Sequence, residues 1–482
     1  MWADRVAARS AVAGCALVAA LLPCRVAWAQ APRDTLVYSV AVMTNDPHLS
    51  VEARITVGPG TLVLNGPPAS GPAGTHVAGL AATNDRGTPL EARHSGSAWF
   101  VTVPDAGAVR FRYRLDFNHR VAEGSTGSGF DTVRLYAVTR SLFVAPDPTA
   151  YRKTDRAYPV VFIHIIPPEG WQTVAGWAGG GDDFQPADGD DLLGATLAVA
   201  PDFRRYGGGA GGTNWGLAIR GHRYFADSSL TAIIDASLRG AASILGPAPV
   251  SFVHYTSDVG RKGRTSGSLQ GRASIGLVWE PSEVLELGRA HDLFHETLHL
   301  WFGGVLETER WWIEGVTDYV AARLYSAWQE RPEDLAYLCW QSMRNYQRIE
   351  QRPTRLTMAQ ENRNRVVGDN TELLVYRKGM LTGLLLDAAI RRGSNGRRTL
   401  DDLSRRLVAI ATPRRAHRVS EAELRQAAVA LGGREVEQVW ARVVTGTELL
   451  TDDEVAAALQ TVTGRTLAPP APLAKNHKEL AR

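Results

Sequence analysis

The chain has 482 residues, with 53 lysine and arginine residues against 50 aspartate and glutamate residues and a net charge of +3. This near balance gives no argument for nucleic acid or an anionic membrane surface as a partner. Hydrophobic residues make up 44% and charged residues 21% of the chain, a globular composition that excludes a largely disordered protein. The length is sufficient for two or three domains with a sizeable core.

The N-terminus, residues 1–29, has the pattern of a signal peptide. Arg5 and Arg9 form a positive region, and residues 11–22 form an apolar run that is too short to span a bilayer. Residues 27–29 read Ala-Trp-Ala, which is typical of a cleavage site. We therefore expect an exported protein, either periplasmic or secreted.

Removal of this segment leaves Cys339 as the only cysteine, so we expect a mature protein without an internal disulfide. No later stretch reaches 18 consecutive apolar residues, and we expect no membrane span. The sequence does not predict an oligomeric state.

The region from residue 30 to residue 147 has an all-β character. Short alternating runs, such as residues 50–57 and 109–115, are separated by turns rich in glycine, proline and asparagine. This pattern predicts a β-sandwich. Further along the chain, residues 158–166 and 250–255 are expected to form buried strands.

A metal-binding motif lies in residues 285–302, an apolar stretch with helical periodicity. His295 and His299 are four residues apart and project from one helix face, so both can reach a single Zn²⁺ at about 2.0–2.1 Å. Glu296 points beside the metal and can take a proton from water held there. His291 lies a further turn away, about 6 Å along the axis, so we leave it out of the metal site.

A third ligand is expected from the stretch WWIEGVTDYV, residues 311–320, where a second amphipathic helix starts near Trp312. Glu314 with the two histidines would leave one zinc position open, which is typical of a catalytic site. Asp318, one turn later, can accept the other ring N–H of His295. The alternative is that both carboxylates only form a solvated helix face.

The segments HETLH (295–299), WWIEGVTDYV (311–320) and YRKGML (376–381) together resemble the gluzincin metallopeptidases. The resemblance is closest to the glycyl aminopeptidase family, with aminopeptidase N as a more distant relative. The stretch LDAAIR, residues 386–391, is similar to the glycyl aminopeptidase pattern specifically. The resemblance covers residues 250–450 and implies a thermolysin-like catalytic domain that holds one zinc ion per chain.

The resemblance also implies roles for single residues. It assigns the zinc ligands to His295, His299 and Glu314, and the general base to Glu296. It assigns the stabilisation of the tetrahedral oxyanion to Tyr376, and a phenol near the metal can donate a hydrogen bond as negative charge develops. The alternative for Tyr376 is an ordinary half-buried tyrosine at the start of an apolar helix.

The substrate-binding segment departs from the family pattern. The family carries a glycine-rich segment that ends in a glutamate, which holds the free α-amine of the substrate. The matching stretch here is GSLQGRAS, residues 267–274, so Gly267 and Gln270 are the candidate substrate-binding residues. Gln270 supplies no negative charge, and a charge-assisted hydrogen bond is about twice as strong as a neutral one. Selectivity for a free amino terminus is therefore left open.

The remainder of the chain is expected to be helical, with helical patterning in residues 330–350, 372–392, 399–411, 419–431 and 434–444. We predict an α+β multidomain protein. Its expected parts are a signal peptide (1–29), a β-sandwich (30–147), a thermolysin-like catalytic domain (148–330), a helical bundle that completes the catalytic region (331–450) and a partly disordered C-terminal tail (451–482).

The sequence therefore predicts an exported zinc metallopeptidase that acts on peptides or proteins and resembles the aminopeptidases. Two alternatives stay open. The first is a zinc endopeptidase or other amide hydrolase, because of Gln270. The second is a non-catalytic binding protein that retains the fold. The peptide preference and the physiological substrate are not predicted.

Overall fold

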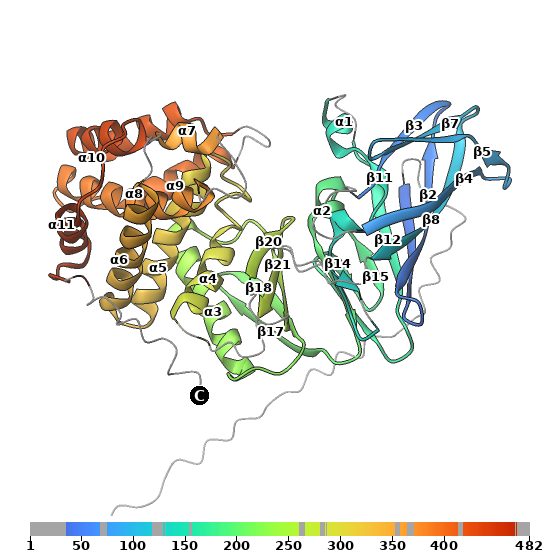
Figure 1. Ribbon diagram of the computed structural model, residues 1–482, viewed down its shortest axis with the longest axis horizontal. Coiled ribbons are helices and arrows are strands. Elements are labelled where there is room, and N and C mark those ends of the chain that lie inside the picture. Colours follow the sequence, from blue (N-terminus) through green and yellow to red (C-terminus); the bar gives the residue numbers. More distant parts are fainter. Residues whose placement is uncertain are drawn as a thin grey trace, which may run out of the picture. The chain divides into compact units, whose positions relative to one another are not determined.

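The computed structural model describes residues 35–67, 75–117, 129–130, 132–153, 157–259, 266–279, 285, 287–351, 357–363, 371–412, 418–467 and 469. The predicted signal peptide lies outside these residues, as does the C-terminal end from residue 470. Both expectations therefore stay predictions. Figure 1 shows strands in the N-terminal part of the chain and helices in the C-terminal part, so the α+β prediction is confirmed.

The largest sheet formed by the described residues has eight strands in the order β14-β15-β12-β1-β2-β8-β4-β5. The strands are β1 (Thr35–Met43), β2 (His48–Val57), β4 (Thr75–Asn84), β5 (Pro89–Leu90), β8 (Gly107–Phe117), β12 (Val160–Ile166), β14 (Ala178–Gly180) and β15 (Asp183–Gln185). In β8, Phe111 and Leu115 are buried while Arg110 and Arg114 are exposed, because alternate side chains of a strand point to opposite faces.

Two four-stranded sheets accompany the large one among the described residues, in the orders β11-β3-β7-β6 and β13-β16-β10-β9. Their strands are β3 (Gly60–Asn65), β6 (Ala92–Ser95), β7 (Ala98–Val103), β9 (Gly129–Phe130), β10 (Leu135–Val138), β11 (Ala145–Pro146), β13 (Gln172–Ala175) and β16 (Thr196–Ala200). The short helices here are η2 (Thr139–Ser141), α1 (Pro148–Lys153) and α2 (Gly189–Gly194). The apolar faces of the large sheet and of both smaller sheets contribute to one buried cluster.

The structure differs from the sequence-based expectation at β12. We expected residues 158–166 to form a buried strand, but alternate side chains of β12 are exposed, including Phe162 and Ile166. The strand pairs in parallel with β1, so one of its faces points to the core and the other to solvent. This pairing also carries the large sheet past residue 147, where the sequence placed a domain boundary. The domain division itself stays a prediction.

A second, five-stranded sheet has the order β17-β18-β19-β21-β20, with β20 at one edge. Its strands are β17 (Arg204–Ala210), β18 (Thr213–Ile219), β19 (Phe252–Val259), β20 (Ser266–Gln270) and β21 (Ser274–Trp279), and helix α3 (Asp227–Leu245) connects β18 to β19. The predicted strand at residues 250–255 falls on β19, and its Val253 and Tyr255 are fully buried. Edge strand β20 contacts the next helix, α4.

The C-terminal part consists of helices. They are α4 (Leu287–Leu298), the π-helical turn η3 (Trp311–Val316), α5 (Thr317–Trp328), α6 (Pro332–Ile349), α7 (Met358–Arg363), α8 (Thr371–Gly393), α9 (Leu400–Ala411), α10 (Glu421–Val439), the π-helical turn η4 (Trp440–Val444) and α11 (Asp452–Thr463). Helix α4 lies between the five-stranded sheet and α5 (Figure 1). The helices expected from the sequence after residue 330 are all present within a few residues.

Helix α11 was not expected, because the sequence-based division assigned residues 451–482 to a partly disordered tail. The start of α11 has a capping box, in which the Thr451 side chain accepts from the backbone N–H of Glu454 and the Glu454 side chain accepts from the backbone N–H of Thr451. Val455, Ala458 and Leu459 are buried on one face of the helix. The capping box was the signal that could have revealed this helix, and the assignment of residues 451–482 to a partly disordered tail stays a prediction.

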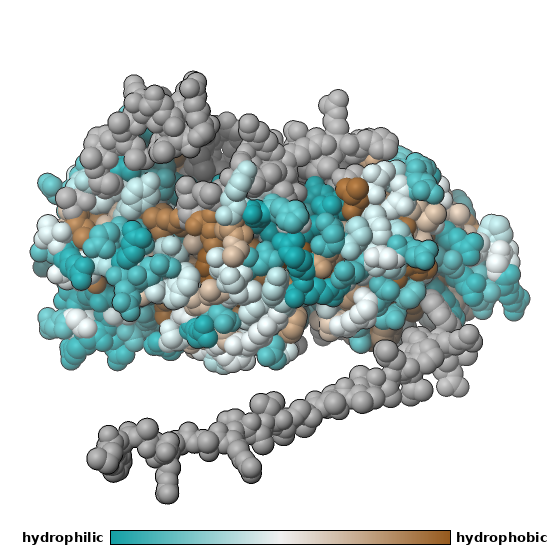
Figure 2. All heavy atoms as spheres, turned by 90° about the horizontal axis from the view of Figure 1, so that it is seen from below, coloured by the Kyte–Doolittle hydropathy of each residue, from teal (hydrophilic) through white to brown (hydrophobic). Residues whose placement is uncertain are grey.

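The face shown in Figure 2 mixes hydrophilic residues with groups of hydrophobic ones. Cys339 is a free cysteine that is buried in α6. No helix among the described residues has the length and apolar character needed to cross a membrane.

Candidate active site

Helix α4 is anchored on the side that faces the protein core. Thr297 is fully buried, and its hydroxyl accepts a hydrogen bond from Ser237 of α3 at 3.1 Å and lies 3.0 Å from the hydroxyl of Tyr255 in β19. Thr297 lies between His295 and His299 in the sequence, so this anchor fixes the rotation of the helix about its axis. The two histidines are thereby turned toward α5 and η3.

The chain continues helically through His299 and then reverses. The backbone N–H of His299 donates to the carbonyl of His295, and Gly303 takes a φ of +101°, a conformation that favours glycine. The carbonyl of Phe302 in this turn lies 2.9 Å from Nδ1 of His299. An acceptor there favours the tautomer with its proton on Nδ1, which leaves Nε2 free to bind a metal.

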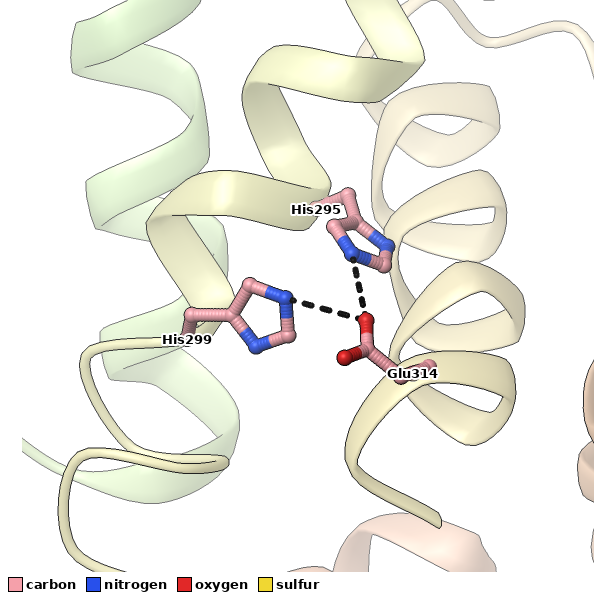
Figure 3. A group of neighbouring side chains, drawn as sticks. All are labelled: His295, His299 and Glu314. Carbon is pink, nitrogen blue, oxygen red and sulfur yellow. Dashed lines mark ion pairs between the residues drawn. The ribbon is translucent and has the colours of Figure 1, made fainter. Parts of the chain in front are cut away.

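Glu314 faces both histidines from the π-helical turn η3. Its Oε2 atom lies 3.7 Å from Nε2 of His295 and 3.6 Å from Nε2 of His299, as Figure 3 shows. One possible ligand atom from each residue lies within 4.8 Å of the other two. Within the part of the chain that the structure describes, no other group of three such side chains has this spacing. Two imidazoles and one carboxylate are a donor set that fits zinc.

The electrostatics of this group favour a charged carboxylate. Burial alone would raise the pKa of Glu314, but His295 and His299 lower it well below the usual value for a glutamate. For His295, burial alone would lower the pKa, but Asp318 and Glu314 raise it well above the usual value for a histidine. The cluster therefore balances buried positive and negative charge among its own members.

Asp318, in the first turn of α5, lies behind the histidines. Its Oδ1 atom is 2.8 Å from Nδ1 of His295, which places an acceptor on the ring nitrogen that faces away from Glu314. The ring of His291 contacts the same residue, with Nε2 at 2.9 Å from the backbone carbonyl of Asp318. His291 thus lies next to the group formed by His295, His299 and Glu314 and is not part of it, as its spacing in the sequence predicts.

Glu296 is held at the edge of the five-stranded sheet. Its Oε2 atom accepts a hydrogen bond of 2.7 Å from the backbone N–H of Leu269 in β20. Burial raises the pKa of Glu296, and the positive charges of His299 and His295 oppose this effect. The contact orients the carboxylate between β20 and the two histidines.

Tyr376 of α8 reaches the same group because two glycines let the helices touch. A Cβ atom on Gly379 would lie 2.7 Å from the carbonyl oxygen of Trp311 and 2.9 Å from Cα of Gly315, so neither glycine leaves room for a larger residue. The Tyr376 ring packs against His295, with ring centroids 6.3 Å apart. Burial raises the pKa of its hydroxyl, and the nearby Glu314 raises it further.

These residues line a cavity of about 880 Å³. Ser268 and Leu269 of β20 also line it. Gln270 ends β20 opposite Ser274, but its side chain lies outside the described part of the structure, and Gly267 has no side chain to contribute. The assignment of both residues to substrate binding stays a prediction.

Part of the cavity wall was not predicted from the sequence. It comes from α6, through Leu338, Gln341 and Ser342, and from Arg289 of α4 and Arg377 of α8. Helical periodicity places the α6 residues on one helix face, but it does not indicate which helix they pack against. Arg377 directly follows Tyr376, and its Nη1 atom lies 4.0 Å from Oδ2 of Asp318.

Comparisons with known proteins support a fold assignment. No family model matches the sequence, and no curated protein matches it. A solved aminopeptidase N family protein from Idiomarina loihiensis is similar over 88% of this chain and 78% of that one, with a TM-score of 0.74 and 17% identity. An M1 zinc metallopeptidase from Deinococcus radiodurans is similar over 87% of this chain and 95% of that one, with a TM-score of 0.57 and 16% identity. At this low identity, the chain shares the fold of these M1-type metallopeptidases.

Proposed function

We propose that this protein is a zinc-dependent metallopeptidase that resembles the aminopeptidases. The observation that carries the proposal is the convergence of His295, His299 and Glu314, whose possible ligand atoms lie within 4.8 Å of one another in the wall of a cavity. Three protein ligands of this kind leave one zinc position open for water or substrate, as catalytic zinc sites do. One zinc ion per chain is the expected content.

The side chains around this group can carry out peptide hydrolysis. Glu296 takes a proton from the attacking water and returns it to the leaving amine, because its carboxylate lies one residue after a metal ligand and opens into the cavity. Its hydrogen bond to the N–H of Leu269 holds it in place before substrate binds. Tyr376 donates its hydroxyl to the carbonyl oxygen as negative charge develops there.

A zinc ion held by the three ligands supplies Lewis acidity, which none of these side chains can supply. The contact between Asp318 and Nδ1 of His295 keeps Nε2 of that ring directed toward Glu314, where it would be available to hold the ion. The carbonyl of Phe302 does the same for His299. Both imidazoles are thus oriented by an acceptor at Nδ1, the ring nitrogen that does not face Glu314.

The structural neighbours support a peptide substrate. A mutant of the Deinococcus radiodurans metallopeptidase is described as bound to a Tyr-Ser-Ala substrate. We propose the same class of substrate here, within a thermolysin-like arrangement of β20, α4 and α5 that follows an N-terminal β-sandwich. We also propose export by residues 1–29, because of their composition.

One observation favours a second candidate function. Gln270 stands where the resemblance expects the glutamate that binds the substrate amine, and a neutral amide binds an ammonium group less strongly. An endopeptidase or another amide hydrolase would not need that charge. The same zinc site would serve either reaction.

A peptide-library digest with and without a chelator tests the proposal. We expect cleavage that the chelator abolishes and that added zinc restores. Pairs of peptides with free and acetylated amino termini separate the two candidates, because an aminopeptidase rejects the blocked form. A protein that contains zinc but cleaves no peptide would overturn the proposed function.

A further inference from the structure

A second cavity, of about 790 Å³, adjoins the catalytic one. Gly288 at the start of α4 lines both cavities, and so do Leu338 and Gln341 of α6. The second cavity therefore continues the space around the metal-binding group, and it ends at Leu467, beyond α11.

The position of Gly288 in the shared wall gives the distance between the second cavity and the metal-binding group. Gly288 precedes His295 by seven residues of α4, which corresponds to about 10 Å along the helix axis. An extended peptide advances about 3.3 Å per residue. A substrate that follows α4 would therefore enter the second cavity at about the third residue from the bond that is cleaved.

The direction of the substrate follows from the other end of the catalytic cavity. Strand β20 meets α4 at Glu296, through the N–H of Leu269, whereas Gly288 lies at the opposite end of the helix. The resemblance assigns β20 to the amino end of the substrate. The residues on the carboxyl side of the cleaved bond would then run along α4 toward the second cavity.

Apolar side chains form one part of the wall of the second cavity, beside polar and charged ones. Leu285, Leu287, Tyr337 and Leu467 line it, and all four are partly buried and pack against the main core. The charged residues of the wall each have a partner of opposite charge, which for Glu333 lies outside the wall. Arg331 lies 3.3 Å from Asp334, and Glu333 lies 3.5 Å from Arg465. A lining without an unbalanced charge favours an apolar side chain over an ionised one.

We propose that this second cavity, lined by Leu285, Leu287, Tyr337 and Leu467, binds an apolar substrate side chain about three residues past the cleaved bond. The inference rests on the proposed peptidase function. It names the substrate class more closely, as peptides of at least four or five residues with an apolar residue at the fourth position.

A peptide series on the full chain tests this inference. Three substrates share a free amino terminus and the same first three residues. One ends after residue three. The other two continue to residue five and carry either leucine or aspartate at position four. We expect kcat/KM to rise for the five-residue leucine peptide relative to the three-residue peptide by about tenfold or more. The aspartate peptide should lack this gain. Equal kcat/KM values for all three peptides would overturn the proposal.

Substitutions in the cavity wall locate the effect. Tyr337→Ala removes apolar lining that does not reach the catalytic cavity, so the ratio of the long-peptide to the short-peptide kcat/KM should fall several-fold. The matched control is Tyr224→Ala, because Tyr224 is 76% exposed and lines neither cavity. This control should keep the ratio. Because the readout is a ratio, a general loss of folded enzyme does not change it, and an unchanged ratio in Tyr337→Ala would contradict the proposal.

A binding measurement separates this inference from the proposed function. Calorimetry with the Glu296→Gln variant reports the Kd of the same peptides without cleavage. A lower Kd for the five-residue leucine peptide supports the cavity assignment even if the wild-type protein cleaves nothing, and equal Kd values overturn it.

Deletion of residues 470–482 should leave the long-peptide kcat/KM unchanged. An increase would assign the cavity to the chain's own C-terminal segment instead.

Discussion

Gly315 and Gly379 bring the turn that carries Glu314 into backbone contact with the helix that carries Tyr376. A Cβ atom on Gly379 would lie 2.9 Å from Cα of Gly315, closer than real side chains approach. Glu314 directly precedes one glycine, and Tyr376 lies one helical turn before the other. The distance between Glu314, the proposed third ligand, and Tyr376, the proposed oxyanion donor, thus depends on both contact positions being glycine.

We expect Gly379→Ala to lower both stability and activity. Alanine alone would favour the helix by about 1 kcal/mol relative to glycine. Overpacking at this contact should instead cost about 1–3 kcal/mol and should separate Tyr376 from Glu314. Chemical denaturation and peptide hydrolysis measure the two effects. Gly58→Ala is the control, because no atom lies within 4 Å of its added Cβ. Unchanged stability in Gly379→Ala would contradict the packing argument.

Glu296→Gln should keep the metal and lose turnover. The substitution preserves the shape of the side chain and its contact with β20 but removes the group that accepts the proton, and general-base catalysis contributes about 10²- to 10⁴-fold. Zinc content and kcat measured on the same preparation check this prediction. Glu437→Gln, at an exposed position of α10, is the matched control. Full activity in the Glu296 variant would remove this residue from the mechanism.

Asp318→Asn should weaken zinc binding without removing a ligand. The carboxylate contacts Nδ1 of His295 at 2.8 Å, and loss of such an outer contact typically costs 10- to 100-fold in metal affinity. Competition with a chromophoric chelator gives the Kd of zinc for both proteins. An unchanged Kd would show that His295 is oriented by other contacts.

Stability should fall as the pH drops from about 6.5 toward 4, in part because of His254. Burial, and to a smaller extent the positive charge of the nearby Arg205, lower the pKa of His254 to about 4. Between these pH values the unfolded chain binds a proton that the folded chain does not, so acid favours unfolding. The loss is at most about 3 kcal/mol, and less to the extent that solvent reaches the ring. His254→Phe should flatten this part of the profile, as measured by denaturation at pH 7 and pH 4.5. An equally steep profile in that variant would assign the effect to other groups.

The proximity of the two histidines could be predicted from the sequence because their spacing is local. Helical periodicity alone places His295 and His299 on one face of α4. Glu314 could be proposed from the second helical stretch and from the resemblance, but its distance from the histidines depends on the turn at Gly303 and on the packing of η3 against α8. The contacts of Asp318 and the exclusion of His291 followed from helix geometry in the same way.

Other parts of the structure depend on contacts between distant residues. The parallel pairing of β1 with β12 joins residues more than a hundred positions apart, and it determines that Phe162 is exposed rather than buried. The wall formed by Leu338 and Gln341 depends on which helix α6 packs against, which local periodicity does not indicate. Helix α11 was predictable, because the capping box from Thr451 to Glu454 is a local signal.

Anomalous diffraction at the zinc edge, from crystals grown with zinc, tests the central claim most directly. We expect one strong peak per chain, about 2.0–2.2 Å from Nε2 of His295, Nε2 of His299 and the carboxylate of Glu314. A matched Glu314→Gln crystal should show a much weaker peak at the same position. A peak elsewhere, or none near these three side chains in the wild-type protein, would contradict the account.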